Sequence, residues 1–127
     1  MRPYFFIRTD KQFVKISHDD IICIESLANY VSITTVNGNY MTLLSLRQLE
    51  EILPEKSFCR ISKSCIASLE FIVSFDKEAV HFKNKKVAFG ERYRLELFEK
   101  LPIVMSDVRE KLKSLSIDTS GIKESIN

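Results

Sequence analysis

The chain has 127 residues, 45% of them hydrophobic and 28% charged, and its formal net charge of +2 comes from 19 basic and 17 acidic residues. This length and composition fit one soluble globular domain. No apolar run approaches the roughly 20 residues that a membrane helix needs, and the start has no signal-peptide pattern. We therefore expect a cytoplasmic protein with no membrane partner, and the near-neutral charge by itself does not indicate nucleic acid.

The side chains that could carry catalysis or bind a metal are scattered along the chain. The cysteines Cys23, Cys59 and Cys65 form no Cys-x-x-Cys pair, and neither His18 nor His81 stands in metal-binding spacing with them. The three glycines lie too far apart for a phosphate-binding loop. We predict no enzyme, no cofactor, no metal site and no small-molecule substrate, with the thiols as apolar fillers in a reducing compartment.

Period-two patterning dominates the chain and predicts a mainly β domain. The predicted strands cover residues 13–16, 21–24, 31–36, 39–44, 71–75, 79–82 and 86–89. The run at 21–24 is almost continuously apolar, which is typical of a strand buried on both faces. Asn37-Gly38 is a strong hairpin signal, because both residues tolerate the positive φ that a tight turn requires.

Three short segments have helical spacing. Ser45 can cap a helix over residues 46–53, with Gln48 completing a capping box, and a second helix over 91–101 ends at Pro102. A third follows Ser106 at 107–115. They do not follow one another closely enough for a helix-turn-helix. We divide the chain into a domain at 1–104, a C-terminal helix at 105–116 and a flexible tail at 117–127.

Several short motifs follow one another in a fixed order. They are DIICIE at 20–25 with NYV at 29–31, SLRQLE at 45–50 with LP at 53–54, FCRISKSCI at 58–66, Ile72, and GERYR at 90–94. In order and spacing they resemble the LytTR family, the DNA-binding domain of LytR/AlgR-type bacterial response regulators. The resemblance covers about two-thirds of the chain, from Asp20 to Leu101, and the combination is more specific than any single motif.

The resemblance implies an elongated LytTR-type β-sheet domain with a C-terminal helix, which serves transcription regulation in a two-component system. It implies that loops, in place of a recognition helix, enter successive major grooves on one DNA face. The partner is double-stranded DNA at promoter direct repeats, bound by a homodimer. Carried over by position, the DNA-binding residues are Asn29, Tyr30, Arg60, Ser62, Lys63, Ser64, Arg92 and Arg94.

These side chains suit contact with DNA, although several have a second interpretation. Lysine and arginine neutralise phosphates or donate to guanine, and asparagine pairs with adenine. Arg60 is either a DNA contact or a structural charge beside a strand, and Asn29 either a base contact or a residue that tolerates a left-handed turn. For Tyr30 and Tyr93, packing is favoured over base stacking.

The departures from the family pattern leave a competing function open. Ser62-Lys63 stands where the family commonly has His-Arg, so a point charge replaces a guanidinium fork. The alternative is therefore a protein-interaction module of the same fold with weakened or lost DNA binding. The DNA-binding hypothesis requires side chains from three separate turns to lie along one edge of the folded molecule.

Overall fold

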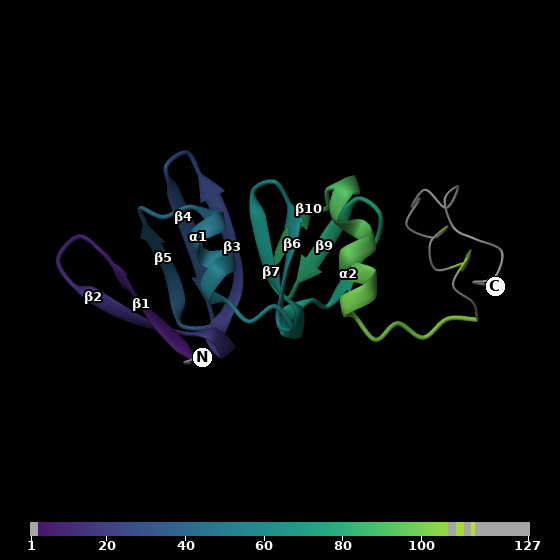
Figure 1. Cartoon of the computed structure of the whole chain (residues 1–127), viewed down its shortest axis with the longest axis horizontal. Coiled ribbons are helices and arrows are strands. Elements are labelled where there is room, and N and C mark those ends of the chain that lie inside the picture. The colour runs from purple at the N-terminus through teal and green to yellow at the C-terminus, as the bar shows by residue number, and fades with distance from the viewer. Residues whose placement is uncertain (1–2, 107–108, 111–112, 114–127) are drawn as a thin grey trace.

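The computed structural model describes residues 3–106, 109, 110 and 113, and strands dominate it (Figure 1). The helices are α1 Leu46–Ile52 and α2 Arg94–Lys100, with 3-10 turns η1 His18–Asp20, η2 Leu69–Phe71 and η3 Glu91–Tyr93. The strands are β1 Tyr4–Arg8, β2 Phe13–Ser17, β3 Ile21–Leu27, β4 Tyr30–Thr35, β5 Gly38–Thr42, β6 Phe58–Ser62, β7 Cys65–Ser68, β8 Ser74–Phe75, β9 Ala79–Phe82 and β10 Lys85–Ala88. The predicted mainly β fold with a few short helices is confirmed.

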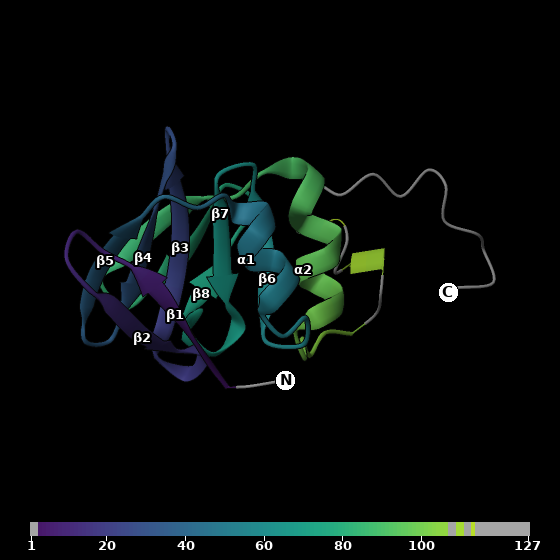
Figure 2. The same ribbon diagram turned by 60° about the vertical axis from the view of Figure 1, so that its left-hand side comes forward.

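The strands form three antiparallel sheets, of which the largest has the order β5-β4-β3-β7-β6. The β1–β2 hairpin lies against its β5–β4–β3 part (Figure 2), and Thr42 fastens it there by donating its hydroxyl to the Arg8 carbonyl at 2.8 Å. The β10-β9-β8 sheet and α2 lie beside β6 and β7. Within the described part of the chain, no helix is long and apolar enough to cross a membrane.

The central strands β3, β6 and β7 are buried on both faces because their side chains alternate between two hydrophobic clusters. Ile24 and Ile66 point to the first cluster, where Leu49 of α1 packs on them. Cys65 points to the second cluster, which contains Leu97 of α2. With both faces covered, only the turns at the ends of these strands remain open to a partner.

The cysteines occupy the interior as the sequence predicts. All three are free and buried, and Cys23, Cys59 and Cys65 belong to the second cluster. Burial, together with the neighbouring Glu96 carboxylate, raises the pKa of the Cys59 thiol to about 12. That thiol is therefore protonated at neutral pH and acts as an apolar side chain.

The capping box predicted for α1 is present. The Ser45 hydroxyl accepts from the Gln48 backbone N–H at 3.1 Å, and the Gln48 side-chain oxygen accepts from the Ser45 N–H at 2.9 Å. Two backbone donors that a helix start leaves open are thereby satisfied. The box fixes where α1 starts, beside the turn that ends β3.

The β4–β5 hairpin is present, but its turn is one residue earlier than predicted. Thr35 pairs with Gly38, so Val36 and Asn37 are the central residues of the turn. Neither of them has a positive φ, whereas Gly38, which follows them, has a φ of +142°. The Thr35 hydroxyl explains the shift, because it accepts from the Asn37 N–H at 3.1 Å and donates to the Gly38 carbonyl at 2.8 Å. A side-chain turn motif therefore overrides the Asn-Gly preference.

Other boundaries differ from the predictions as well. The predicted strand at 71–75 is wrong over its first half, since η2 ends at Phe71 and β8 covers only Ser74–Phe75. The predicted helix at 91–101 is split into η3 and α2, and β1 was not predicted at all. The expected C-terminal helix at 105–116 falls largely outside the described residues, and the tail at 117–127 lies wholly outside them.

Replacing Ser45 with alanine tests the capping box. We expect the Ser45→Ala variant to lose about 1 kcal/mol of unfolding free energy, because the Gln48 backbone N–H in the first turn of α1 loses its acceptor. The measurement is urea unfolding followed by circular dichroism. Ser45→Asp keeps an acceptor and should stay within a few tenths of a kcal/mol of the unmodified chain. Equal stability of the alanine variant would contradict this role.

Candidate nucleic-acid interface

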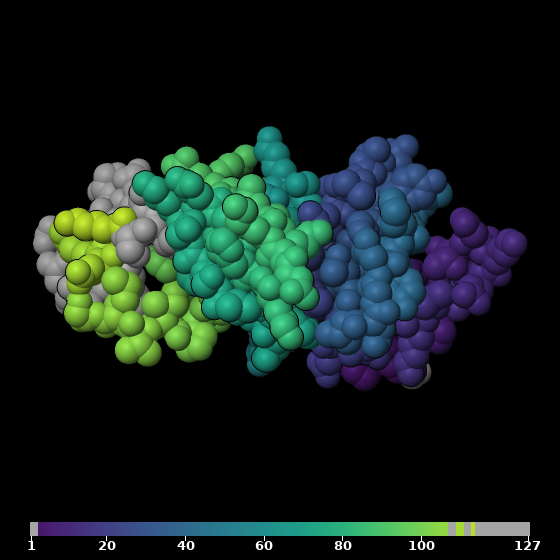
Figure 3. Space-filling model, turned by 180° about the vertical axis from the view of Figure 1, so that it is seen from behind, coloured from purple at the N-terminus to yellow at the C-terminus, as the bar shows by residue number. Residues whose placement is uncertain are grey.

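Backbone pairing brings three segments far apart in the sequence to one edge of the molecule. The turns that follow β3 and β6 meet where the Ser26 N–H donates to the Ser64 carbonyl at 2.9 Å. The start of η3 joins them, because the Gly90 N–H donates to the Ile61 carbonyl at 2.8 Å. The β3–β4 turn, the β6–β7 turn and the N-terminal end of α2 all lie along the upper edge in Figure 1. From behind, the β6–β7 turn in teal and the β3–β4 turn in blue rise from the upper outline of the surface (Figure 3).

The β3–β4 turn presents an amide and an aromatic ring to solvent. Asn29 is exposed, and Tyr30 is 45% exposed, so the packing expected for that ring is incomplete. Among the described non-glycine residues, only Ala28 takes a positive φ, at 56°. The left-handed position of the turn therefore belongs to Ala28, which leaves Asn29 without the conformational explanation that the sequence allowed.

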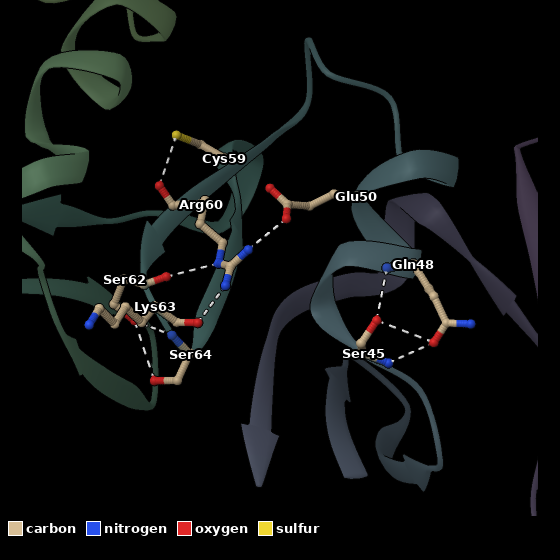
Figure 4. A network of polar contacts seen from close by, with 8 residues as sticks. All are labelled: Ser45, Gln48, Glu50, Cys59, Arg60, Ser62, Lys63 and Ser64. Carbon is tan, nitrogen blue, oxygen red and sulfur yellow. Dashed lines mark hydrogen bonds and ion pairs between the residues drawn. The ribbon is translucent and has the colours of Figure 1, made fainter. Parts of the chain in front are cut away.

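The β6–β7 turn is held in shape by Arg60 (Figure 4). The guanidinium donates to the Ser62 carbonyl at 2.9 Å, to the Lys63 carbonyl, and to the Glu50 carboxylate of α1 at 2.6 Å. The Ser62 hydroxyl accepts from the Ser64 N–H at 3.2 Å within the same turn. Arg60 thus connects the turn to α1, and its planar fork suits three acceptors at once.

Lys63 at the tip of this turn differs from Arg60 in orientation and in partners. Figure 4 shows its ammonium directed away from Arg60 and from α1. The residue is exposed, and its side chain makes no hydrogen bond or ion pair within the described part of the chain. Its charge is therefore open to an external anion.

The third segment, η3 and the start of α2, contains one exposed arginine and one half-buried arginine. Arg92 in η3 is exposed and forms no ion pair with any described residue, whereas Arg94 at the start of α2 is half-buried. A side chain at Gly90 would place its Cβ 2.9 Å from the Tyr93 ring. The glycine leaves room for this ring to pack against the second cluster, while the neighbouring Arg92 is exposed.

A groove between the first two turns includes a residue that the sequence analysis missed. Arg47, the second residue of α1, is exposed and lines this groove of about 800 Å³. Its other lining residues are Ser26, Ala28, Asn29, Leu43, Leu44, Ser45, Leu46, Gln48, Glu50, Arg60 and Lys63. The signal available in the sequence was a cation in the first turn of a capped helix, where acidic residues are preferred.

Across the described residues, no group of three or more His, Cys, Asp or Glu side chains could hold a metal ion. The edge instead carries exposed amide, hydroxyl, ammonium and guanidinium groups from three turns. These groups suit hydrogen bonding to phosphate oxygens and base edges.

The chain is similar to known proteins both in sequence and in fold. The sequence model of the LytTr DNA-binding domain matches residues 11–102. The fold is similar to the solved LytTr DNA-binding domain of a protein described as a methyl-accepting/DNA response regulator from Bacillus cereus. The TM-score is 0.72 at 16% sequence identity, over 81% of this chain and 100% of that chain. No curated protein matches the chain. Because the family match spans most of the sequence, the chain belongs to the LytTR family of DNA-binding domains.

Proposed function

We propose that this chain binds double-stranded DNA sequence-specifically in bacterial transcription regulation, and that it acts as a DNA reader without catalytic activity. The supporting observation is that three turns carrying Asn29, Lys63 and Arg92 lie along one edge with these side chains exposed. Membership of the LytTR family supports the same function. Loops along this edge enter successive major grooves on one DNA face.

Each exposed group has a distinct role in this proposal. The Asn29 amide can donate to N7 and accept from N6 of adenine, and Lys63 can donate to guanine O6 and N7. Arg92 neutralises a phosphate or reads guanine, depending on how deeply η3 enters the groove. Tyr30 contacts the sugar-phosphate backbone beside the first turn, since its ring is half outside the core.

The remaining predicted site residues lie at the β6–β7 turn and at the start of α2. Arg60 acts mainly by shaping the turn, because three of its N–H groups already have acceptors. Ser62 and Ser64 place their hydroxyls at the turn, where they can donate to phosphate oxygens. Arg94 at the start of α2 is half-buried, so it contributes less than Arg92 and contacts only the DNA backbone.

Two copies of the domain bind adjacent direct repeats in the promoter, as a homodimer assembled on DNA. Each copy takes one half-site, because its loops approach a single face of the duplex. A cytoplasmic location follows from the proposed partner.

A protein-interaction module of the same fold is the second candidate. The observations that favour it are the formal net charge of only +2 and the lysine at position 63. Such a module would keep the edge as a contact surface for another protein while binding DNA weakly. The two candidates differ in their response to salt, since DNA binding releases condensed counterions.

Alanine substitutions at Lys63 and Arg92 separate these functions. We expect each to weaken binding by about 1–3 kcal/mol for a duplex selected from a random pool by the unmodified chain. The logarithm of the association constant should fall with the logarithm of salt concentration by about 0.9 per phosphate contact. Fluorescence anisotropy measures both quantities. Lys56→Ala is the matched control. Lys56 is exposed, and it lies just before the start of β6, at the end of that strand opposite the β6–β7 turn.

Two results would contradict the DNA-binding proposal. One is the absence of duplex binding at low salt, and the other is an affinity that does not change with salt. Retention of a protein partner by the Lys63→Ala and Arg92→Ala variants, with no DNA binding by the unmodified chain, would favour the interaction module.

The positioning role of Arg60 predicts a different signature. Arg60→Ala should weaken DNA binding and also speed hydrogen exchange of the Ser64 amide, because the turn loses two carbonyl hydrogen bonds and its link to Glu50 of α1. Lys63→Ala should weaken DNA binding and leave that exchange rate unchanged. Exchange measured by NMR distinguishes the two variants. An unchanged Ser64 exchange rate in Arg60→Ala would show that Arg60 does not hold the turn.

A further inference from the structure

A further pocket lies at the edge of the molecule opposite the candidate interface. Strands β3 and β7 run between the two edges, because each has one end at an interface turn and the other at η1 or η2. The pocket has a volume of about 680 Å³, and small-molecule sites span about 300–1,000 Å³. Its walls come from the start of the chain, η1, the segment between α1 and β6, and η2, along the lower edge in Figure 1.

Backbone hydrogen bonds hold the walls of this pocket together. The His18 N–H donates to the Pro3 carbonyl at 3.0 Å, which joins η1 to the start of the chain. The Leu69 N–H donates to the Ser57 carbonyl at 2.9 Å, which joins η2 to the segment before β6. The pocket is therefore preformed and needs no rearrangement of these segments to admit a ligand.

Two polar side chains in the wall of the pocket are almost fully buried. His18 is 7% exposed and Ser68 is 3% exposed, and neither side chain makes a hydrogen bond with any described residue. The His18 ring lies between the rings of Phe5 and Phe58, with centroid distances of 5.7 and 6.4 Å. Folded proteins pair most buried polar groups, because an unpaired one costs free energy. The imidazole and the hydroxyl thus retain unused hydrogen-bonding capacity inside the pocket.

The mouth of the pocket carries negative charge. Asp19 of η1 and Glu70 of η2 are exposed, line the pocket and form no ion pair within the described part of the chain. None of the described residues that line the pocket is a lysine or an arginine. Burial lowers the pKa of His18 more than the neighbouring Asp19 carboxylate raises it, so the imidazole is mainly neutral at neutral pH. The pocket therefore favours a cation over an anion.

We propose that this pocket binds a small organic cation that has a protonated amine, an aromatic or apolar body and a second polar group. The ammonium donates to the Asp19 and Glu70 carboxylates at the mouth. The body lies against Phe58 and Phe71, which also line the pocket. The second polar group pairs with the buried Ser68 hydroxyl and the neutral imidazole. This site goes beyond the proposed DNA binding and leaves the opposite edge open to DNA.

Three matched compounds test the class of ligand. Tyramine has the amine, the ring and a hydroxyl group, phenethylamine lacks the hydroxyl group, and 4-hydroxyphenylacetate has a carboxylate in place of the amine. We expect tyramine to bind about fivefold more tightly than phenethylamine, which cannot use the buried polar pair. It should bind about tenfold more tightly than 4-hydroxyphenylacetate, because of the two carboxylates. NMR titration of the whole chain measures the affinities, and the amide signals of Asp19 and Glu70 should shift.

Substitutions assign the two halves of the site. Asp19→Asn and Glu70→Gln should each weaken tyramine binding about threefold, because each removes one exposed carboxylate. Ser68→Ala should remove most of the advantage of tyramine over phenethylamine and leave the affinity for phenethylamine unchanged. Glu51→Gln is the matched control, since Glu51 is an exposed carboxylate of α1 that does not line the pocket.

Several results would overturn the cation site. They are no binding of tyramine, equal binding of tyramine and 4-hydroxyphenylacetate, or equal losses in Glu70→Gln and Glu51→Gln. A Ser68→Ala variant that keeps the full preference for tyramine would contradict the role of the buried pair. Tyramine should bind equally well to the chain with and without its selected duplex, because the two sites lie at opposite edges. A chain that selects no duplex but binds tyramine would refute DNA reading and retain this pocket.

Discussion

The antiparallel pairing of β3 with β7 is the constraint on which the candidate interface depends. Ile24 lies opposite Ile66 and Glu25 opposite Cys65, so two strands far apart in the sequence share one register. The ladder continues to the bond between the Ser26 N–H and the Ser64 carbonyl. A shift of one residue would turn every side chain of β7 to the opposite cluster. The two hydrophobic clusters therefore fix not only the core but also the level at which the two turns end.

The shape of the turns at this edge depends on one backbone conformation and one side chain that lie outside the hydrophobic clusters. Ala28 adopts a left-handed conformation that is unfavourable for a residue with a Cβ. Arg60, whose side chain is only 23% exposed, binds both the turn carbonyls and Glu50. Rigid turns of this kind lose little conformational entropy on binding. The edge is thus preorganised, while Lys63 and Arg92 remain free to adapt to a partner.

The distribution of charge explains how a nearly neutral chain can present a cationic edge. The carboxylates of Glu25 and Glu96 pair with Lys85 and Lys100. Pairing with Glu25 raises the pKa of Lys85, so that lysine stays charged within the ion pair. The net charge counts the charges in these ion pairs equally with the unpaired, exposed cations. Only the unpaired, exposed cations attract a polyanion strongly. Summed charge is therefore a poor guide to this surface.

The sequence by itself determined the local features. The capping box of Ser45 and Gln48, the apolar run of β3 and the buried cysteines follow from propensities and periodicity that act over a few residues. The motif order was sufficient for the family and the mainly β fold. Only the tertiary structure decided that Arg60 is directed at Glu50 and the turn carbonyls, that Arg47 lines the groove, and that the β4–β5 turn is centred on Val36 and Asn37. These features depend on hydrogen bonds between side chains and backbone across different elements, and residue spacing along one strand carries no information about such contacts.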